Sequence, residues 1–222
     1  AAWPAATPLI LLWVLSPAFA WRISLPPMLV EEQALAPQEM RSLRLVARRT
    51  WRYFETFVNA EGHALPPDNF QEDPESVIAY RTSPTNIGLY LLSTTVAHDF
   101  GWIGTLETVK RLEETFETMK DLRRLRGHFF NWYDIHNLRP LDPVYVSMVD
   151  SGNLAGHLIA VAQACREFIC RPSFGPEVLA GIRDALELLI DAEKRAEHPG
   201  RAQTVTVAHL REAMEGMRGL LD

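Results

Sequence analysis

Two long polar segments of this 222-residue chain hold the side chains best suited to chemistry. Residues 59–83 contain the strings HALPPDNFQEDP and AYRTS, and residues 127–150 contain GHFFNWYDIHN and VSMVD. Carboxylate, amide and guanidinium groups hydrogen-bond the hydroxyls of sugars, and aromatic rings stack on the apolar faces of sugars. This mixture predicts a carbohydrate-binding site. The candidate substrate-binding residues in these segments and in the helix starts that follow them are Asp68, Phe70, Gln71, Arg81, Asn86, Asn131, Trp132, Tyr133, Asp134, Asp150 and Asn153.

The acidic members of this set also have simpler explanations. Asp134 and Asp150 are the candidate catalytic carboxylates within the chain, but either can instead bind sugar hydroxyls. Asp150 or Ser151 can also act as the N-cap of the helix that follows. Asp68 and Glu72 are either substrate ligands or turn residues.

Each of the remaining candidate residues has two alternative roles. Arg81 either contacts the substrate or pairs with a loop carboxylate. Trp132 and Tyr133 form either a stacking platform or a plug at the mouth of the fold. Asn86 and Asn153 lie early in apolar helices, where a buried amide needs a partner, and that partner is either ligand or backbone.

The sequence predicts no metal or cofactor site in this chain. Its histidines, including His128, His136 and His157, lack the spacing of metal ligands. It has no G-x-G-x-x-G, Walker or G-x-S-x-G motif. The net charge of -6 argues against a nucleic-acid partner, which usually requires a basic face. We interpret Cys165 and Cys170 as free thiols.

Five expected helices position the polar segments. Pro37–Val58, Thr105–Arg123 and Pro176–Lys194 carry their apolar residues in one stripe, which is typical of a helix buried on one face. Pro84–Asp99 and Gly152–Ile169 are apolar nearly all round, which predicts burial on every side. Outer and inner helices therefore alternate along the chain. A further helix is expected over residues 204–220 without a clear place in this alternation.

The linkers between these helices alternate as well. Residues 100–104 and 171–175 are short linkers, whereas the two polar segments are long. Because consecutive helices run antiparallel, both long segments should lie at one end, where functional loops usually gather. Inner helices ringed by outer helices are the architecture of an (α/α)6 toroid. The sequence therefore predicts an all-α fold, a partial toroid-type array of helical hairpins.

The first part of the chain has a different composition. Residues 1–21, AAWPAATPLILLWVLSPAFAW, contain no charged side chain and reach the length of a membrane span. We interpret them as the end of a transmembrane segment, and residues 22–36, with the Pro26–Pro27 pair, as a linker. Residues 37–222 then form the N-terminal part of the toroid domain. A buried apolar arm of a soluble protein is the alternative for residues 1–21.

Four strings give a more specific indication. LPPDNFQEDP, RTSPTNIGLYLLS, FFNWYD and VDSGNLAGHL, in this order, resemble the cyclic β-1,2-glucan synthases, at the start of their middle, glycoamylase-like module. The resemblance covers about residues 49–168. It implies a multi-pass protein of the bacterial inner membrane that uses UDP-glucose as donor. The middle module is implied to close linear β-1,2-glucan into a ring by retaining transglycosylation.

The resemblance also limits what this chain can do alone. Retaining chemistry needs two carboxyl groups about 5–5.5 Å apart, and the resemblance implies that they lie beyond Asp222. The fragment alone is then expected to be inactive and to supply part of the glucan groove. The implied partners are β-1,2-glucan, the inner membrane and other domains of the same polypeptide. The alternative is a non-catalytic glucan-binding or interdomain helical scaffold.

Overall fold

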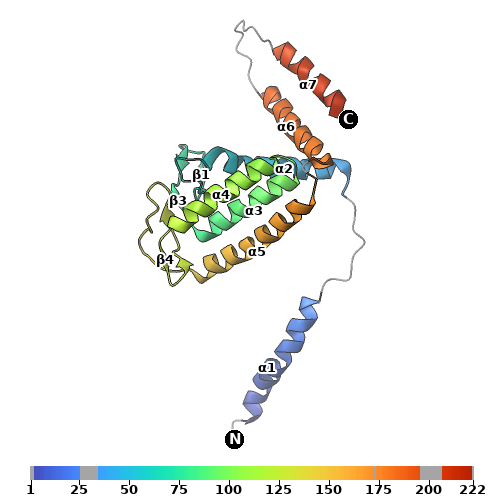
Figure 1. Ribbon diagram of the computed structural model, residues 1–222. Helices are drawn as coiled ribbons and strands as arrows, with labels where there is room; N and C mark the ends of the chain where they lie inside the picture. Colours follow the sequence, from blue (N-terminus) through green and yellow to red (C-terminus); the bar gives the residue numbers. More distant parts are fainter. Residues whose placement is uncertain (1–2, 26–34, 173, 196–206, 222) are drawn as a thin grey trace. The chain divides into compact units, whose positions relative to one another are not determined.

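The computed structural model of the protein describes residues 3–25, 35–172, 174–195 and 207–221. By compactness the chain divides into two units, residues 1–40 and 41–222. The helices of these described ranges, labelled in Figure 1, are α1 (Trp3–Ser24), α2 (Pro37–Phe57), α3 (Pro84–Asp99), α4 (Thr105–Asp121), α5 (Met148–Cys170), α6 (Pro176–Arg195) and α7 (Val207–Leu221). The all-α class and the expected order of helices are confirmed.

The first unit contains α1. Residues 6–24 of α1 are long and apolar enough to cross a membrane, and within the described part of the chain no other helix meets that test. Large apolar side chains such as Trp13 and Phe19 are exposed. These features agree with the predicted end of a transmembrane segment, which stays a prediction. Residues 26–34 of the predicted linker lie outside the described residues.

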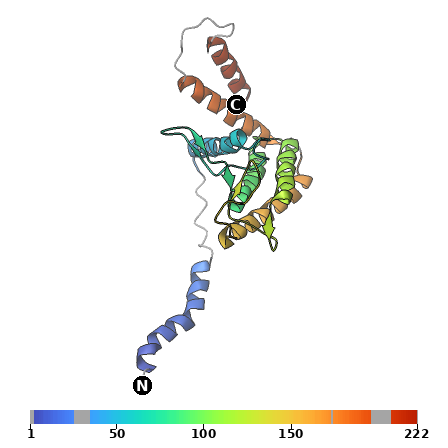
Figure 2. The same cartoon turned by 90° about the vertical axis from the view of Figure 1, so that its left-hand side faces the viewer.

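The inner helices α3 and α5 pack side by side. Figure 1 shows α3 between α4 and α5, and Figure 2 shows the same three helices from the side. The approach is close because Gly88 has no side chain: a Cβ there would lie 2.7 Å from Nδ1 of His157. The core around them draws on α3, α4, α5 and both long segments, and includes Leu65, Ile87, Leu91, Leu112, Met119, Leu122, Phe130, Tyr133, Ile135, Leu154 and Val161.

The two inner helices differ in burial. α3 is buried on most of its surface, as predicted, whereas α5 fully buries only Leu154 and Val161. The apolar pattern of Gly152–Ile169 predicts burial on every side, whereas in this chain one side is open, because no described element packs on the far face of α5. The exposed residues of this face, here called the open face of α5, include Gly152, Ala155, Gly156, Ile159, Ala160 and Gln163.

The starts of the inner helices confirm one predicted cap and correct another. Ser83 is the N-cap of α3, its hydroxyl accepting a hydrogen bond from the backbone N–H of Asn86, and Pro84 follows in the first turn. α5 begins at Met148, and its N-cap is Ser147, which accepts from the N–H of Asp150. The prediction that Asp150 or Ser151 caps this helix is wrong, since both already lie inside its first turn.

Three small antiparallel strand pairs, which the sequence did not indicate, form in and directly before the long segments. β1 (Phe70–Gln71) pairs with β2 (Val77–Ile78), and β4 (Arg124–Leu125) pairs with β5 (His128–Phe129). The third pair joins the two segments to each other. In it, β3 (Arg81–Thr82) pairs with β6 (Tyr133–Asp134), placing Arg81 opposite Asp134 and Thr82 opposite Tyr133. Both long segments therefore lie at one end of the helices, as predicted (Figure 1).

A buried ion pair attaches α6 to the rest of the second unit. The carboxylate of Asp184 is buried and accepts hydrogen bonds from Nε and Nη2 of Arg44, the latter at 2.6 Å, and from Nε1 of Trp102 at 2.8 Å. Next to it, Gly181 meets the turn after α3 so closely that a Cβ would collide with the carbonyl oxygen of Gly101. The Arg44–Asp184 ion pair and the close backbone contact at Gly181 together define where α6 packs.

Replacing Asp184 with alanine should strongly destabilise the second unit. The variant leaves the guanidinium of Arg44 without its carboxylate, and the loss of one partner of a buried pair typically costs about 3 kcal/mol in the free energy of unfolding. Asp191→Ala is the matched control, because its pair with Arg49 is more exposed and such pairs contribute about 1 kcal/mol or less. Urea unfolding of the chain measures both. Equal losses in the two variants would contradict the anchoring role of Asp184.

Candidate functional site

Asp68 is the centre of a first polar cluster at the end where the long segments meet. One of its oxygens accepts hydrogen bonds from Nε and Nη2 of Arg81 at 3.1 and 2.9 Å. The other accepts from the side-chain amide of Asn86 at 3.3 Å. Of the two alternatives for Arg81, pairing with a loop carboxylate is therefore confirmed. The exposed half of its side chain remains accessible to a ligand.

Trp132 lies beside this cluster. The guanidinium carbon of Arg81 is 4.8 Å from the centroid of the Trp132 ring, a cation–π contact. Because β3 pairs with β6, this contact joins side chains from the two long segments. The structure therefore brings together four predicted site residues here, namely Asp68, Arg81, Asn86 and Trp132.

A second polar cluster connects the first turns of α3 and α5. The hydroxyl of Thr85 donates to the carboxylate of Asp150 at 2.6 Å and accepts from the side-chain amide of Asn153 at 3.1 Å. Asp150 and Asn153 were predicted site residues, and Thr85 was missed. Its position two residues after the N-cap serine, in the string RTSPTN, was the available signal. Because Thr85 and Asn86 are neighbours in α3, the two clusters adjoin.

Five predicted site residues lie outside these clusters. Tyr133 is fully buried, and its hydroxyl donates to the carbonyl of Arg123 and accepts from the N–H of Phe130. Burial raises the pKa of this hydroxyl above its ordinary value. A stacking role for Tyr133 is therefore wrong, because no face of its ring is free. Asn131 is also buried, and its side-chain oxygen has no hydrogen-bond partner among the described residues.

The other three residues serve their own turns or neighbours. An oxygen of Asp134 accepts from the backbone N–H groups of His136 and Asn137, which stabilises the turn after β6. Gln71 donates from its side chain to the carbonyl of Glu75 within the β1–β2 hairpin. Phe70 lies 4.8 Å from Phe57 of α2, measured between ring centroids. These contacts leave Asp68 and Asp150 as the carboxylates of the two clusters.

Tyr53 of α2 supports the loop that carries Asp68. Its hydroxyl donates to the carbonyl of Pro67 at 2.8 Å. Burial, and to a smaller extent the negative charge of Asp68, raise the pKa of Tyr53 to about 12. The neutral phenol is thus maintained as a donor over the whole neutral range.

Asp68→Asn should lower the pKa of Tyr53 from about 12 while leaving it above the ordinary value of about 10, because burial is the larger cause. The tyrosinate absorbance as a function of pH measures this, and Tyr53→Phe identifies the transition. A raised pKa stabilises the fold fully below about pH 10, and this contribution is lost as the pH rises towards 12. An unchanged transition in Asp68→Asn would show that the carboxylate does not act on Tyr53.

The fold defines the class of protein. Over 71% of this chain it matches the structure of a candidate glucoamylase from Bacteroides fragilis NCTC 9343 with a TM-score of 0.50 and 18% identity, covering 37% of that chain. An endo-β-1,2-glucanase from Chitinophaga pinensis, in complex with sophorotriose and glucose, gives a TM-score of 0.47 and 15% identity over 68% of this chain and 36% of its own. No protein-family model matches. The chain thus has the partial α/α-toroid fold of glucoamylase-like proteins.

The sequence comparison is more particular. The cyclic β-(1,2)-glucan synthase NdvB of Rhizobium meliloti (strain 1021) is 52% identical over 186 residues. The match covers 83% of this chain and 7% of that protein. The resemblance inferred from the four strings is therefore confirmed: this chain is similar to a short segment of a cyclic β-(1,2)-glucan synthase.

Proposed function

We propose that this chain supplies part of the glucan-binding groove of a cyclic β-1,2-glucan synthase, in the module that closes linear glucan into a ring by transglycosylation. The observation that carries the proposal is the pair of adjoining polar clusters at the first turns of α3 and α5. Both are built from the side-chain types that bind sugars, and they lie at the end of the helices where the long segments meet. The 52% identity to a synthase segment supports the same assignment.

Each cluster residue has a definite part in this proposal. Trp132 offers its ring to the apolar face of a glucose unit, with Arg81 holding the indole in place. Asp68 and Asp150 accept hydrogen bonds from sugar hydroxyls, oriented by Arg81 and by Thr85. Because the two carboxylates belong to separate clusters with their own partners, we assign them recognition and place the nucleophile and acid/base in the polypeptide beyond residue 222.

The same proposal assigns the remaining steps to other parts of the synthase. UDP-glucose is the donor for chain elongation, which takes place in another region of the synthase. The segment formed by this chain needs no cofactor. The parent protein lies in the bacterial inner membrane, and α1 is the end of one of its membrane spans. The open face of α5 is covered by another helical hairpin of the synthase, outside this chain, since the fold matched here occupies only 37% of the related glucoamylase-like chain.

In the complete synthase, Asp150→Asn and Trp132→Ala should each reduce ring closure about tenfold while chain elongation continues. The first variant replaces a charged acceptor of sugar hydroxyls with a neutral amide, and the second removes the stacking ring. Separate measurement of linear and cyclic product checks both. Asp134→Asn is the control, because an asparagine oxygen can still accept the turn hydrogen bonds of Asp134. If elongation fell as much as cyclisation, or if neither changed, these residues would not belong to a cyclisation groove.

The proposed covering of the open face of α5 gives a second prediction. Ile159 is 73% exposed, so Ile159→Glu should change the free energy of unfolding of this chain by about 0.5 kcal/mol or less. In the complete synthase the same change would bury a carboxylate and should lower the melting temperature clearly. Leu106→Glu on the outer helix α4, where the side chain is 84% exposed, should be mild in both proteins. A mild effect of Ile159→Glu in the synthase would refute the covering of α5.

A further inference from the structure

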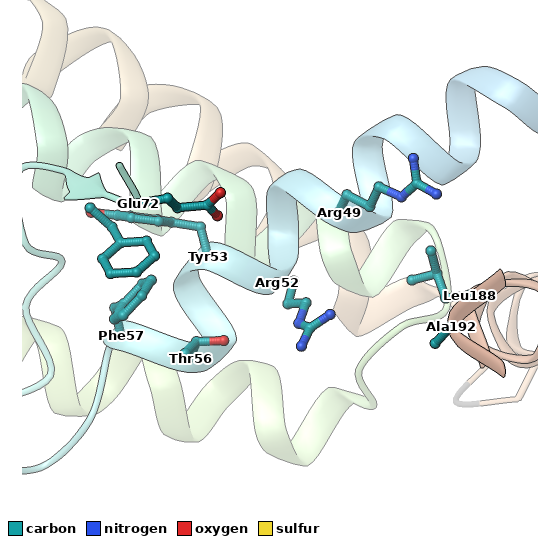
Figure 3. Close-up of a pocket in the computed structure, with 9 residues that line it drawn as sticks. Arg49, Arg52, Tyr53, Thr56, Phe57, Glu72, Leu188 and Ala192 are labelled. Atoms are coloured by element: carbon teal, nitrogen blue, oxygen red, sulfur yellow. The ribbon is translucent and has the colours of Figure 1, made fainter. Parts of the chain in front are cut away.

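A hollow beside α2 shares no lining residue with the two polar clusters. It has a volume of about 500 Å³, within the range of about 300–1,000 Å³ typical of small-molecule sites. It is bounded by α2, the β1–β2 hairpin region and α6 (Figure 3). Its lining residues are Arg49, Arg52, Tyr53, Thr56, Phe57, Phe70, Glu72, Leu188 and Ala192.

Aromatic rings form one end of this hollow. The Phe57 ring lies 4.8 Å from Phe70 and 5.2 Å from Tyr53, measured between centroids. All three rings are half-buried, so part of their surface faces the hollow. Figure 3 shows Tyr53 and Phe57 at this end, and Leu188 and Ala192 of α6 at the opposite end. A flat apolar surface is therefore available beside an open volume.

Two arginines and one glutamate line the hollow. Arg49 is paired with Asp191 of α6 at 2.9 Å. Within the described part of the chain, no hydrogen bond or ion pair engages the guanidinium of Arg52 or the carboxylate of Glu72. Figure 3 shows Arg52 between the rings and α6, with Glu72 beside Tyr53. One unpaired donor group and one unpaired acceptor group, together with the hydroxyl of Thr56, suit a neutral polyhydroxyl ligand better than a simple anion.

We propose that this hollow is a second carbohydrate-binding site, which holds a segment of the glucan outside the groove. The proposal rests on the proposed function for the identity of the ligand, a β-1,2-linked glucose oligomer. Phe70 stacks against the apolar face of one sugar unit, with Phe57 behind it. The donors of Arg52 and the acceptors of Glu72 bind hydroxyls of the same chain. Phe70, predicted from the sequence as a substrate ligand, thus serves this site rather than the two polar clusters.

Nuclear magnetic resonance of the whole chain can report on the two sites separately. The probe is a linear β-1,2-glucan oligomer, added to protein with labelled backbone amides, arginine side chains and indoles. Titration should shift the Nε–H signal of Arg52 and the amides around Thr56 and Phe57. Arg52→Ala should weaken the affinity read from the Phe57 amide about tenfold. Phe70→Leu, which keeps an apolar side chain against Phe57 but removes the flat ring, should weaken it as well.

Two controls keep the test decisive. Arg166→Ala removes an exposed arginine from α5 and should leave the Phe57 response unchanged. Trp132→Ala should abolish shifts near the polar clusters and leave those at Arg52 intact, so failure of the groove and failure of the second site are distinguishable. The proposal is overturned if glucan shifts only the Trp132 region, if Arg52→Ala binds as tightly as the parent chain, or if inorganic phosphate shifts Arg52 and glucan does not.

Discussion

The backbone pairing of β3 with β6 is the constraint on which the candidate site depends. It joins two segments that are separated along the chain by two helices, and it presents Arg81 and Trp132 to each other. Tyr133 also ties β6 to the turn before it, because its buried hydroxyl donates to the carbonyl of Arg123 and accepts from the N–H of Phe130. Without this hydroxyl, the carbonyl of Arg123 and the N–H of Phe130 would each lose a hydrogen-bond partner. The site is therefore assembled on the core and does not rest on mobile loops.

The helices could be predicted from the sequence because their signals are local and repeated. Apolar periodicity and the Ser83–Pro84 start give the bounds of α3 as they are found, Pro84–Asp99. The start of α5 was missed by four residues because its first turn, Met148–Ser151, is followed by glycine and carries no continuous apolar pattern. Strands of two residues have no periodicity at all, so β1 to β6 had no signal that the sequence alone could offer.

The residue types of the candidate site could be predicted from the sequence, but not which of these residues would contact one another. The residue types indicated sugar binding, and the structure brings Asp68, Arg81, Asn86 and Trp132 together, and Asp150 with Asn153. Residue types cannot show which polar side chains are already hydrogen-bonded to another part of the chain. Tyr133 and Asp134 illustrate this, since both resemble ligands in the sequence but are hydrogen-bonded to backbone groups at most ten residues away along the chain. Thr85 illustrates the converse, an ordinary residue that becomes a bridge only when α3 and α5 meet.

The parallel course of α3 and α5 has an electrostatic consequence. Each helix carries roughly half a positive elementary charge at its N-terminus, and both N-termini lie at the same end because a long segment precedes each of them. The outer helices run the opposite way, so the dipoles of the whole bundle largely cancel, but the two positive ends of α3 and α5 lie side by side. Asp150 lies in the first turn of α5, and Asp68 accepts a hydrogen bond from Asn86 in the first turn of α3, so each positive end has a carboxylate beside it. The effect of a helix end is confined to its first turn, so every further inner helix of a toroid would bring one more local site that favours electron-rich oxygen atoms at the mouth of the fold.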